Sequence, residues 1–366
     1  MKLRPNPIRC VIYGLVTVVA TMTGASPAFA DRYRDAQWHL TALHVADAHR
    51  VTKGAGVTVA VIDTGVWADH PDLNGAVLPG RNVLENGGDG RSDVNGHGTG
   101  IASIIAARGR SGERGVLGVA PAAKILPLRP NSDTSLVADA INWSVRQGAM
   151  VINMSFVVTG SAELAAAIKS AADADVVLIA ASGNDGQNSS TDDYPAAYPN
   201  VLAVAAVDRR GQAARFSHRG ADVDIAAPGV GIPAADGSLT DGYVIADGTS
   251  PAAAVVSGAA ALIRARYPDL SAAEVVQRLT STAVDKGPPG RDDTYGHGSL
   301  DLMAALTADA PPPSKSPSVP ATKPPGDARG EDDGSGVPLL AIGLGVLMLA
   351  GAAVAAVVVV RKREGS

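Results

Sequence analysis

Short apolar runs alternate with longer amphipathic or alanine-rich stretches between residues 57 and 268. The runs have the length and β-branched content of strands that are covered on both faces, and they fall at 57–62, 123–128, 150–155, 176–181, 201–207 and 223–227. The stretches between them predict helices at about 133–147 and 162–172, and an Ala/Val-rich helix follows at 247–268. This alternation predicts an α/β fold, in which a mostly parallel central sheet lies between two layers of helices.

The first 30 residues have the pattern of a secretory signal peptide. Three basic residues precede an apolar run at 11–19, and the Ala-Phe-Ala of 28–30 matches the small-x-small pattern of a cleavage site. We therefore predict a signal peptide over 1–30. An uncleaved membrane anchor is the alternative.

A second long apolar segment, 337–360, contains 24 residues without a charge. A helix of this length, at about 1.5 Å per residue, crosses the roughly 30 Å core of a bilayer. The tail 361–366 begins Arg-Lys-Arg, which favours the cytoplasmic side. The preceding residues, 308–336, are proline-rich and typical of an extended linker. These patterns predict a single-pass protein of the cell membrane, with its main domain, 57–307, outside the cell.

The segment 31–56 joins the predicted signal peptide to the first strand. It is polar, but its scattered apolar residues, among them Leu40 and Leu43, could form one side of a short helix. Twenty-six residues cannot supply the core of a folded pro-domain, so we expect a permanent extension packed on the domain. His39, His44 and His49 recur every five residues, which is not one helical face, and we interpret them as surface or packing residues.

Charge and cysteine content exclude some classes of protein. The chain of 366 residues has a formal net charge of −5, which argues against a nucleic-acid partner. Its one cysteine, Cys10, can form no internal disulfide. Acidic residues gather in the loop between Asp63 and His97, at positions 69, 72, 85, 89 and 93. Their spacing matches no twelve-residue calcium loop, so we expect a solvated loop and no metal cofactor, although a structural calcium ion is possible.

Four polar residues stand where strands end or helices begin. Asp63 and Asn184 follow apolar strands, and the C-terminal ends of parallel strands are where open sheets bind their ligands. His97 lies between two glycines at the head of an apolar helix. Ser250 opens the 247–268 helix, where free backbone N–H groups and the helix dipole favour negative charge. Ser250 is either a nucleophile or an ordinary helix cap, and Asp63 and Asn184 have equally ordinary roles in turns.

The blocks VAVIDTG (59–65), NGHGTG (95–100), SGND (182–185) and DGTSPAA (247–253) resemble, in this order, the signature blocks of the subtilisin-like serine proteases. The resemblance implies a subtilisin-like three-layer sandwich and a serine endopeptidase. It also implies that Asp63 orients the imidazole, that His97 is the general base and acid, and that Ser250 is the nucleophile. Asn184 and the backbone N–H of Ser250 would form the oxyanion hole.

The same resemblance places substrate-binding residues on two segments. It implies contacts from the residues that end two of the strands: Ser155, Phe156, Val157, Ser182 and Gly183. Relatives often have glycine where this chain has Val157 and Val158, so we expect a narrower cleft that favours small residues before the scissile bond. Pro251, directly after the nucleophile, also departs from the family pattern but suits a first helical turn.

The order of signal peptide, short extension, protease domain, proline-rich linker and C-terminal anchor resembles that of the mycosins, membrane-anchored subtilases of type VII secretion. The resemblance implies a cell-surface endopeptidase that cleaves secreted proteins or peptides. It also implies type VII secretion components as possible partners. The alternative is a structural component of the secretion complex whose peptidase activity is dispensable.

Overall fold

The computed structural model describes residues 32–84, 87–110, 114–186, 193–238 and 242–309. These residues all belong to one compact unit, Met1–Ser314. The predicted signal peptide, transmembrane helix and cytoplasmic tail, and all but two residues of the predicted linker, lie outside the described residues. Within the described part of the chain, no helix is both long and apolar enough to cross a membrane.

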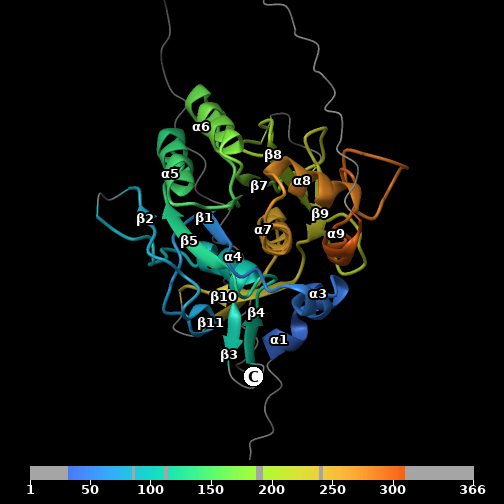
Figure 1. Cartoon of the computed structure of the whole chain (residues 1–366), viewed down its shortest axis with the longest axis horizontal. Coiled ribbons are helices and arrows are strands. Elements are labelled where there is room, and N and C mark those ends of the chain that lie inside the picture. Colours follow the sequence, from blue (N-terminus) through green and yellow to red (C-terminus); the bar gives the residue numbers. More distant parts are fainter. Residues whose placement is uncertain (1–31, 85–86, 111–113, 187–192, 239–241, 310–366) are drawn as a thin grey trace, which may run out of the picture. The chain divides into compact units, whose positions relative to one another are not determined.

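A seven-stranded sheet with the order β2-β5-β1-β6-β7-β8-β9 forms the centre of the unit (Figure 1). Each pair of neighbours is parallel, as the alternation of strands and helices predicts. The strands are β1 (Thr58–Ile62), β2 (Arg81–Asn82), β5 (Lys124–Arg129), β6 (Val151–Met154), β7 (Val177–Ala181), β8 (Val201–Val207) and β9 (Ile225–Pro228). Because the strands are parallel, their C-terminal ends lie at one edge of the sheet.

Helices cover both faces of this sheet. In β1, Val59 and Val61 enter one hydrophobic core, whereas Ala60 and Ile62 enter the other, as the two-residue period of a strand requires. Helices α5 (Thr134–Arg146) and α6 (Ala162–Asp173) lie side by side on the second core (Figure 1). The first core contains α4 (His97–Ala106), α7 (Thr249–Arg266), α8 (Ala272–Ser281) and α9 (Leu302–Thr307).

Helix α7 is nearly all buried, because its small residues allow close packing against strands and helices alike. A Cβ at Gly258 would lie 2.6 Å from that of Val119, so only glycine fits at this contact. Downstream, Ser271 and Glu274 form the capping box that opens α8. A second Gly-His-Gly triplet, at 296–298, forms backbone hydrogen bonds to Asp224 and Ala226.

Two short antiparallel pairs lie outside the main sheet and were not predicted. They are β3 (Arg108–Arg110) with β4 (Arg114–Leu117), and β10 (Ile232–Asp236) with β11 (Gly242–Ala246). The first pair explains one error of the sequence analysis. Asp72, expected in a solvated loop, is fully buried, where it accepts hydrogen bonds from Arg110 Nε at 3.1 Å and from the Val116 N–H at 2.7 Å. The Asp72 carboxylate therefore binds residues of β3 and β4 inside the protein.

The extension before β1 forms three short helices, α1 (Arg32–Ala36), α2 (Trp38–Ala42) and α3 (Val45–Val51), and not the single helix expected. The side-chain amide of Gln37 pairs with the backbone of Leu117 in both directions, at 2.8 and 2.9 Å. Trp38 Nε1 donates to the Val230 carbonyl at 3.0 Å. Leu43 and Val45 enter the first core, so the extension contacts the rest of the unit through both polar and apolar groups.

His39 of α2 gives the unit a testable pH dependence. The side chain is fully buried without a hydrogen-bond partner among the described residues, and burial lowers its pKa to about 3. An unfolded chain would protonate this histidine near pH 6.5, so stability is lost as pH falls below that value. We expect the free energy of unfolding to fall by about 2 kcal/mol between pH 7 and pH 5 from this group.

Urea unfolding of the wild type and of His39→Leu at pH 7 and pH 5 measures this contribution. Leucine needs no proton, so the variant should lose the part of the pH dependence due to His39. His44→Leu is the matched control, because the His44 side chain is 69% exposed and should leave the dependence unchanged. Equal pH dependence in wild type and His39→Leu would contradict the expectation.

Candidate active site

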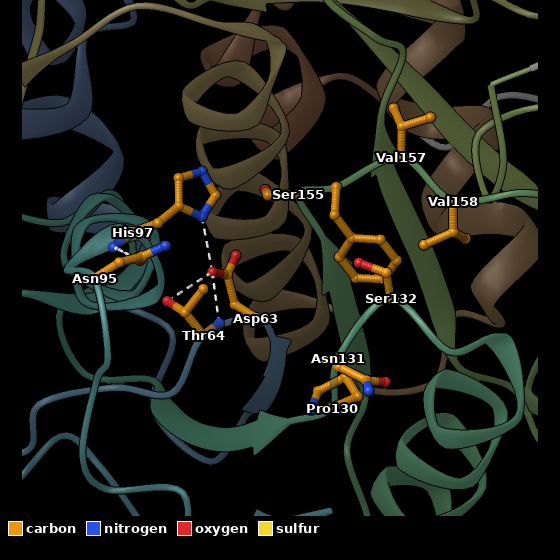
Figure 2. A pocket seen from close by; sticks show the side chains of 11 residues that line it. Asp63, Thr64, Asn95, His97, Pro130, Asn131, Ser132, Ser155, Val157 and Val158 are labelled. Carbon is orange, nitrogen blue, oxygen red and sulfur yellow. Dashed lines mark hydrogen bonds and ion pairs between the residues drawn. The ribbon is translucent and has the colours of Figure 1, made fainter. Parts of the chain in front are cut away.

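Asp63 and His97 form a hydrogen-bonded pair at the C-terminal edge of the sheet (Figure 2). Asp63 directly follows β1, and its Oδ1 lies 2.7 Å from His97 Nδ1. A carboxylate only accepts hydrogen bonds, so Nδ1 carries the proton and Nε2 is left as the basic nitrogen. The carboxylate side chain is 3% exposed and the imidazole 42% exposed. The pair therefore presents a fixed imidazole tautomer to the solvent.

Asp93 fixes the two segments that carry this pair. Its Oδ1 accepts from the Thr64 hydroxyl at 2.8 Å and from the Gly96 N–H at 3.0 Å, and its Oδ2 accepts from the Thr99 N–H at 2.8 Å. One carboxylate thus joins the turn after Asp63 to the first turn of α4. The expectation of a solvated acidic loop is wrong for Asp93 as well. The only sequence signal for this role is the general preference for Asp near a helix start.

Close contact between the same segments explains a glycine of the NGHGTG block. A Cβ at Gly98 would lie 2.1 Å from the Gly65 carbonyl oxygen. The head of α4 can therefore approach the turn after β1 only if position 98 has no side chain. This approach brings His97 within hydrogen-bonding distance of Asp63.

The pKa of His97 is raised above its usual value of 6.5. Removal of the ring from water lowers the pKa, but the charge and hydrogen bond of Asp63, together with the charge of Asp93, outweigh that effect. The neutral imidazole, which can accept a proton, is therefore available only above this raised pKa. Chemistry that uses His97 as a base should decline as pH falls through it.

Ser250 lies in the first turn of α7, at the same edge of the sheet. Its hydroxyl donates to the Ser155 carbonyl at 3.1 Å, and the Ser155 hydroxyl donates to the Ser250 carbonyl at 3.2 Å. Ser155 also lines the cleft beside His97 (Figure 2). Among the hydrogen bonds of the described residues, none joins Ser250 to His97, so the serine hydroxyl here is turned toward the end of β6.

Asn184 follows β7 and is bound to the residue before Ser250. Its Oδ1 accepts from the Thr249 N–H at 2.9 Å and from the Thr249 hydroxyl at 3.1 Å. With the amide oxygen engaged in this way, the exposed side chain presents its Nδ2 group, a hydrogen-bond donor, next to Gly248. A donor of this kind at the head of α7 can stabilise negative charge on a bound oxygen atom.

A cleft of about 360 Å³ runs from the Asp63–His97 pair to the segment after β6 (Figure 2). Its walls include Ser155, Phe156 and Val157, three of the predicted substrate-binding residues. Val157 is 47% exposed. Ser182 and Gly183, predicted from the same resemblance, are buried and are not among the residues that line this cleft. No group of three or more His, Cys, Asp or Glu side chains suited to a metal ion occurs within the described residues.

Comparisons with known proteins find relatives of this chain by sequence and by structure. The profile of the subtilase family matches residues 54–298. Subtilisin DY of Bacillus licheniformis is 41% identical over 261 residues, which cover 69% of this chain and 92% of the relative. The structure of MycP3 protease from the type VII (ESX-3) secretion system is similar with a TM-score of 0.67 and 35% identity, over 74% of this chain and 88% of that one. A chain in the structure of an intact ESX-5 inner membrane complex gives a TM-score of 0.69 and 30% identity, over 84% of both chains.

Proposed function

Because the chain belongs to the subtilase family and is a serine endopeptidase, we propose that Asp63, His97 and Ser250 are its catalytic triad. The observation that carries the proposal is the 2.7 Å contact between the buried Asp63 carboxylate and His97 Nδ1. It holds the imidazole in the tautomer whose Nε2 can take a proton from a serine hydroxyl. Rotation of the Ser250 side chain away from the Ser155 carbonyl would present that hydroxyl to His97.

The proposed reaction proceeds through an acyl-enzyme. His97 Nε2 takes the Ser250 proton as the serine oxygen attacks the carbonyl carbon of the scissile bond, and Asp63 stabilises the imidazolium that forms. Asn184 Nδ2 and the Ser250 N–H donate to the oxyanion. His97 then protonates the leaving amine, and water, activated by the same imidazole, releases the acid product and restores Ser250.

We propose that the cleft selects peptides with small residues before the scissile bond. Support comes from Phe156 and Val157, which occupy its wall with bulky side chains. A substrate with a large aromatic side chain at that position would have to displace them. We propose proteins or peptides as the substrates, since the chain is a serine endopeptidase.

We further propose a mycosin-like role at the cell membrane. Support comes from the structural similarity to the MycP3 protease and to a chain of the ESX-5 inner membrane complex. The predicted signal peptide 1–30, anchor 337–360 and cytoplasmic tail 361–366 would place the protease domain outside the cell. A second candidate role, favoured by the similarity to a chain of an assembled complex, is structural, with the peptidase activity dispensable for secretion.

Two measurements test these proposals. A fluorophosphonate, which reacts with activated serines, should label the full-length protein at Ser250, as mass spectrometry of the labelled peptide would establish. Labelling elsewhere, or none, would contradict the triad. In cells that lack the protein, complementation with wild type and with Ser250→Ala then separates the two roles. If only the wild type restores secretion, secretion requires proteolysis. If wild type and Ser250→Ala restore it equally, the structural role is favoured.

A further inference from the structure

A buried histidine lies between two carboxylates behind the Asn184 segment. His218, in the loop after β8, is 6% exposed. Its Nε2 is 3.0 Å from Asp222 Oδ1, and its Nδ1 is 3.8 Å from Asp193 Oδ2. Both carboxylates belong to loops, and Asp193 is as buried as the histidine. The triad chemistry described above makes no use of these groups.

The cluster contacts the active site through Gly183. The backbone N–H of His218 donates to the Gly183 carbonyl at 3.0 Å. A Cβ at Gly183 would lie 1.9 Å from Asp193 Oδ2 and 3.5 Å from the His218 Cβ, so the cluster packs directly against this glycine. Gly183 in turn exchanges hydrogen bonds with the Thr249 hydroxyl, each at 3.3 Å. Thr249 also holds Asn184 and precedes Ser250.

We propose that His218, as an imidazolium between Asp193 and Asp222, is a positioning residue that holds segment 182–184 in place and thereby aims the Asn184 amide at the oxyanion. The ion pair with Asp222 lies within the loop after β8, whereas the ion pair with Asp193 joins this loop to a carboxylate that packs against Gly183. Loss of the positive charge leaves a neutral ring between the buried carboxylate of Asp193 and the partly buried carboxylate of Asp222, which weakens the contacts that hold Gly183. This inference rests on the proposed role of Asn184 in the oxyanion hole.

The charges around His218 favour its protonated form. The hydrogen bond that His218 donates to Asp222 raises the pKa of His218 above 6.5, burial opposes this, and the charges of Asp222, Asp193 and Asp185 add to the increase. Two other charged groups lie nearby. The charge of Arg291 helps to lower the pKa of Asp222, and the charge of Asp222 adds to the effect of burial in raising the pKa of Asp224. The imidazolium therefore persists to higher pH than that of an ordinary histidine, and it is lost as pH rises through the raised pKa.

The expected signature is a step in kcat on the alkaline side. Wild-type kcat should fall from one plateau to a lower one as His218 loses its proton, with KM little changed, because the oxyanion contact forms in the transition state. The step should be several-fold. It must be smaller than the loss of about a hundredfold to a thousandfold that follows complete removal of such a donor.

Peptide hydrolysis by the full-length wild type and by His218→Asn, followed from neutral to alkaline pH, tests this. The variant should remain on the lower plateau throughout and show no step. Asp222→Asn, which keeps the shape of the side chain but removes the main source of the raised pKa, should move the step to lower pH. Asn184→Ala should abolish it, since no amide remains to be aimed. His44→Asn, the same substitution on an exposed histidine, should reproduce the wild-type profile.

A His218→Asn profile identical to that of wild type, or a step that persists in Asn184→Ala, would overturn the inference. If His218→Asn does not fold, the pH at which kcat falls in Asp222→Asn still tests the inference. A merely structural role for the cluster would not shift the midpoint of that fall. Failure of the proposed function gives a different result: no hydrolysis by the wild type, or undiminished hydrolysis by Ser250→Ala.

Discussion

Replacement of Ser250 or of His97 by alanine is expected to lower kcat for peptide hydrolysis on the order of a millionfold, the loss known for subtilisin. The nucleophile and the base act in one step, so either loss alone ends covalent catalysis. The double variant should therefore be about as slow as each single one. Initial rates with a peptide substrate, measured for the two single variants and the double variant, check both statements.

Ser257→Ala is the matched control for Ser250→Ala. Ser257 lies in the same helix, and its buried hydroxyl donates to the Ala253 carbonyl at 2.8 Å and accepts from Asn153 Nδ2 at 3.0 Å. This variant tests whether any serine lost from α7 disturbs the site, and it should keep kcat near the wild-type value. Near-normal turnover by Ser250→Ala would refute the proposed triad, whatever the control did.

The elements predicted well from sequence are those whose burial leaves a strong pattern. Strand β8 has the predicted bounds, because a strand covered on both faces is apolar at every position. Helices α5 and α6 differ from their predicted ranges by no more than one residue at either end. Asp133 and Ser161 cap their N-termini, as sequence rules predict. The placement of Asp63 and Asn184 after strands follows from the same pattern.

The elements missed are those with weak or interrupted patterns. Within the described residues, strands β10 and β11 pair only with each other. Pro233 interrupts the apolar pattern of the first, and the second is a run of five residues. In the extension, His44 adopts a left-handed conformation with φ of 52°, which separates α2 from α3. A non-glycine residue in this conformation gives no signal in the sequence.

Polar contacts between distant segments could not be predicted where no motif marks their residues. Asp93 and Asp72 look like any loop carboxylate in sequence, yet each accepts hydrogen bonds from residues that only the fold brings near. The contact of His218 with Gly183 joins loops after two different strands in the same way. Motifs therefore identify the groups of the proposed chemistry, and the three-dimensional contacts identify the groups that hold them in place.

Asp63→Asn should lower kcat on the order of ten-thousandfold, less than the loss of Ser250 or His97. An asparagine amide can donate to the imidazole as well as accept from it, so His97 Nδ1 need no longer carry the proton. The ring then adopts the tautomer whose Nε2 holds a hydrogen and cannot accept one from Ser250. Steady-state rates at a pH well above the raised pKa of His97 measure this loss without interference from protonation of the base.

The same substitution should move the acid limb of kcat/KM. In the wild type, activity is lost as pH falls through the raised pKa of His97, and Asp63 is the main cause of the increase. Without its charge and hydrogen bond, burial of the ring lowers the pKa, so the limb of Asp63→Asn should lie at lower pH. Asp69→Asn removes an exposed carboxylate from the same loop and should leave both rate and limb unchanged. An Asp63→Asn enzyme that was slow but kept the wild-type limb would mean that Asp63 does not set the protonation of His97.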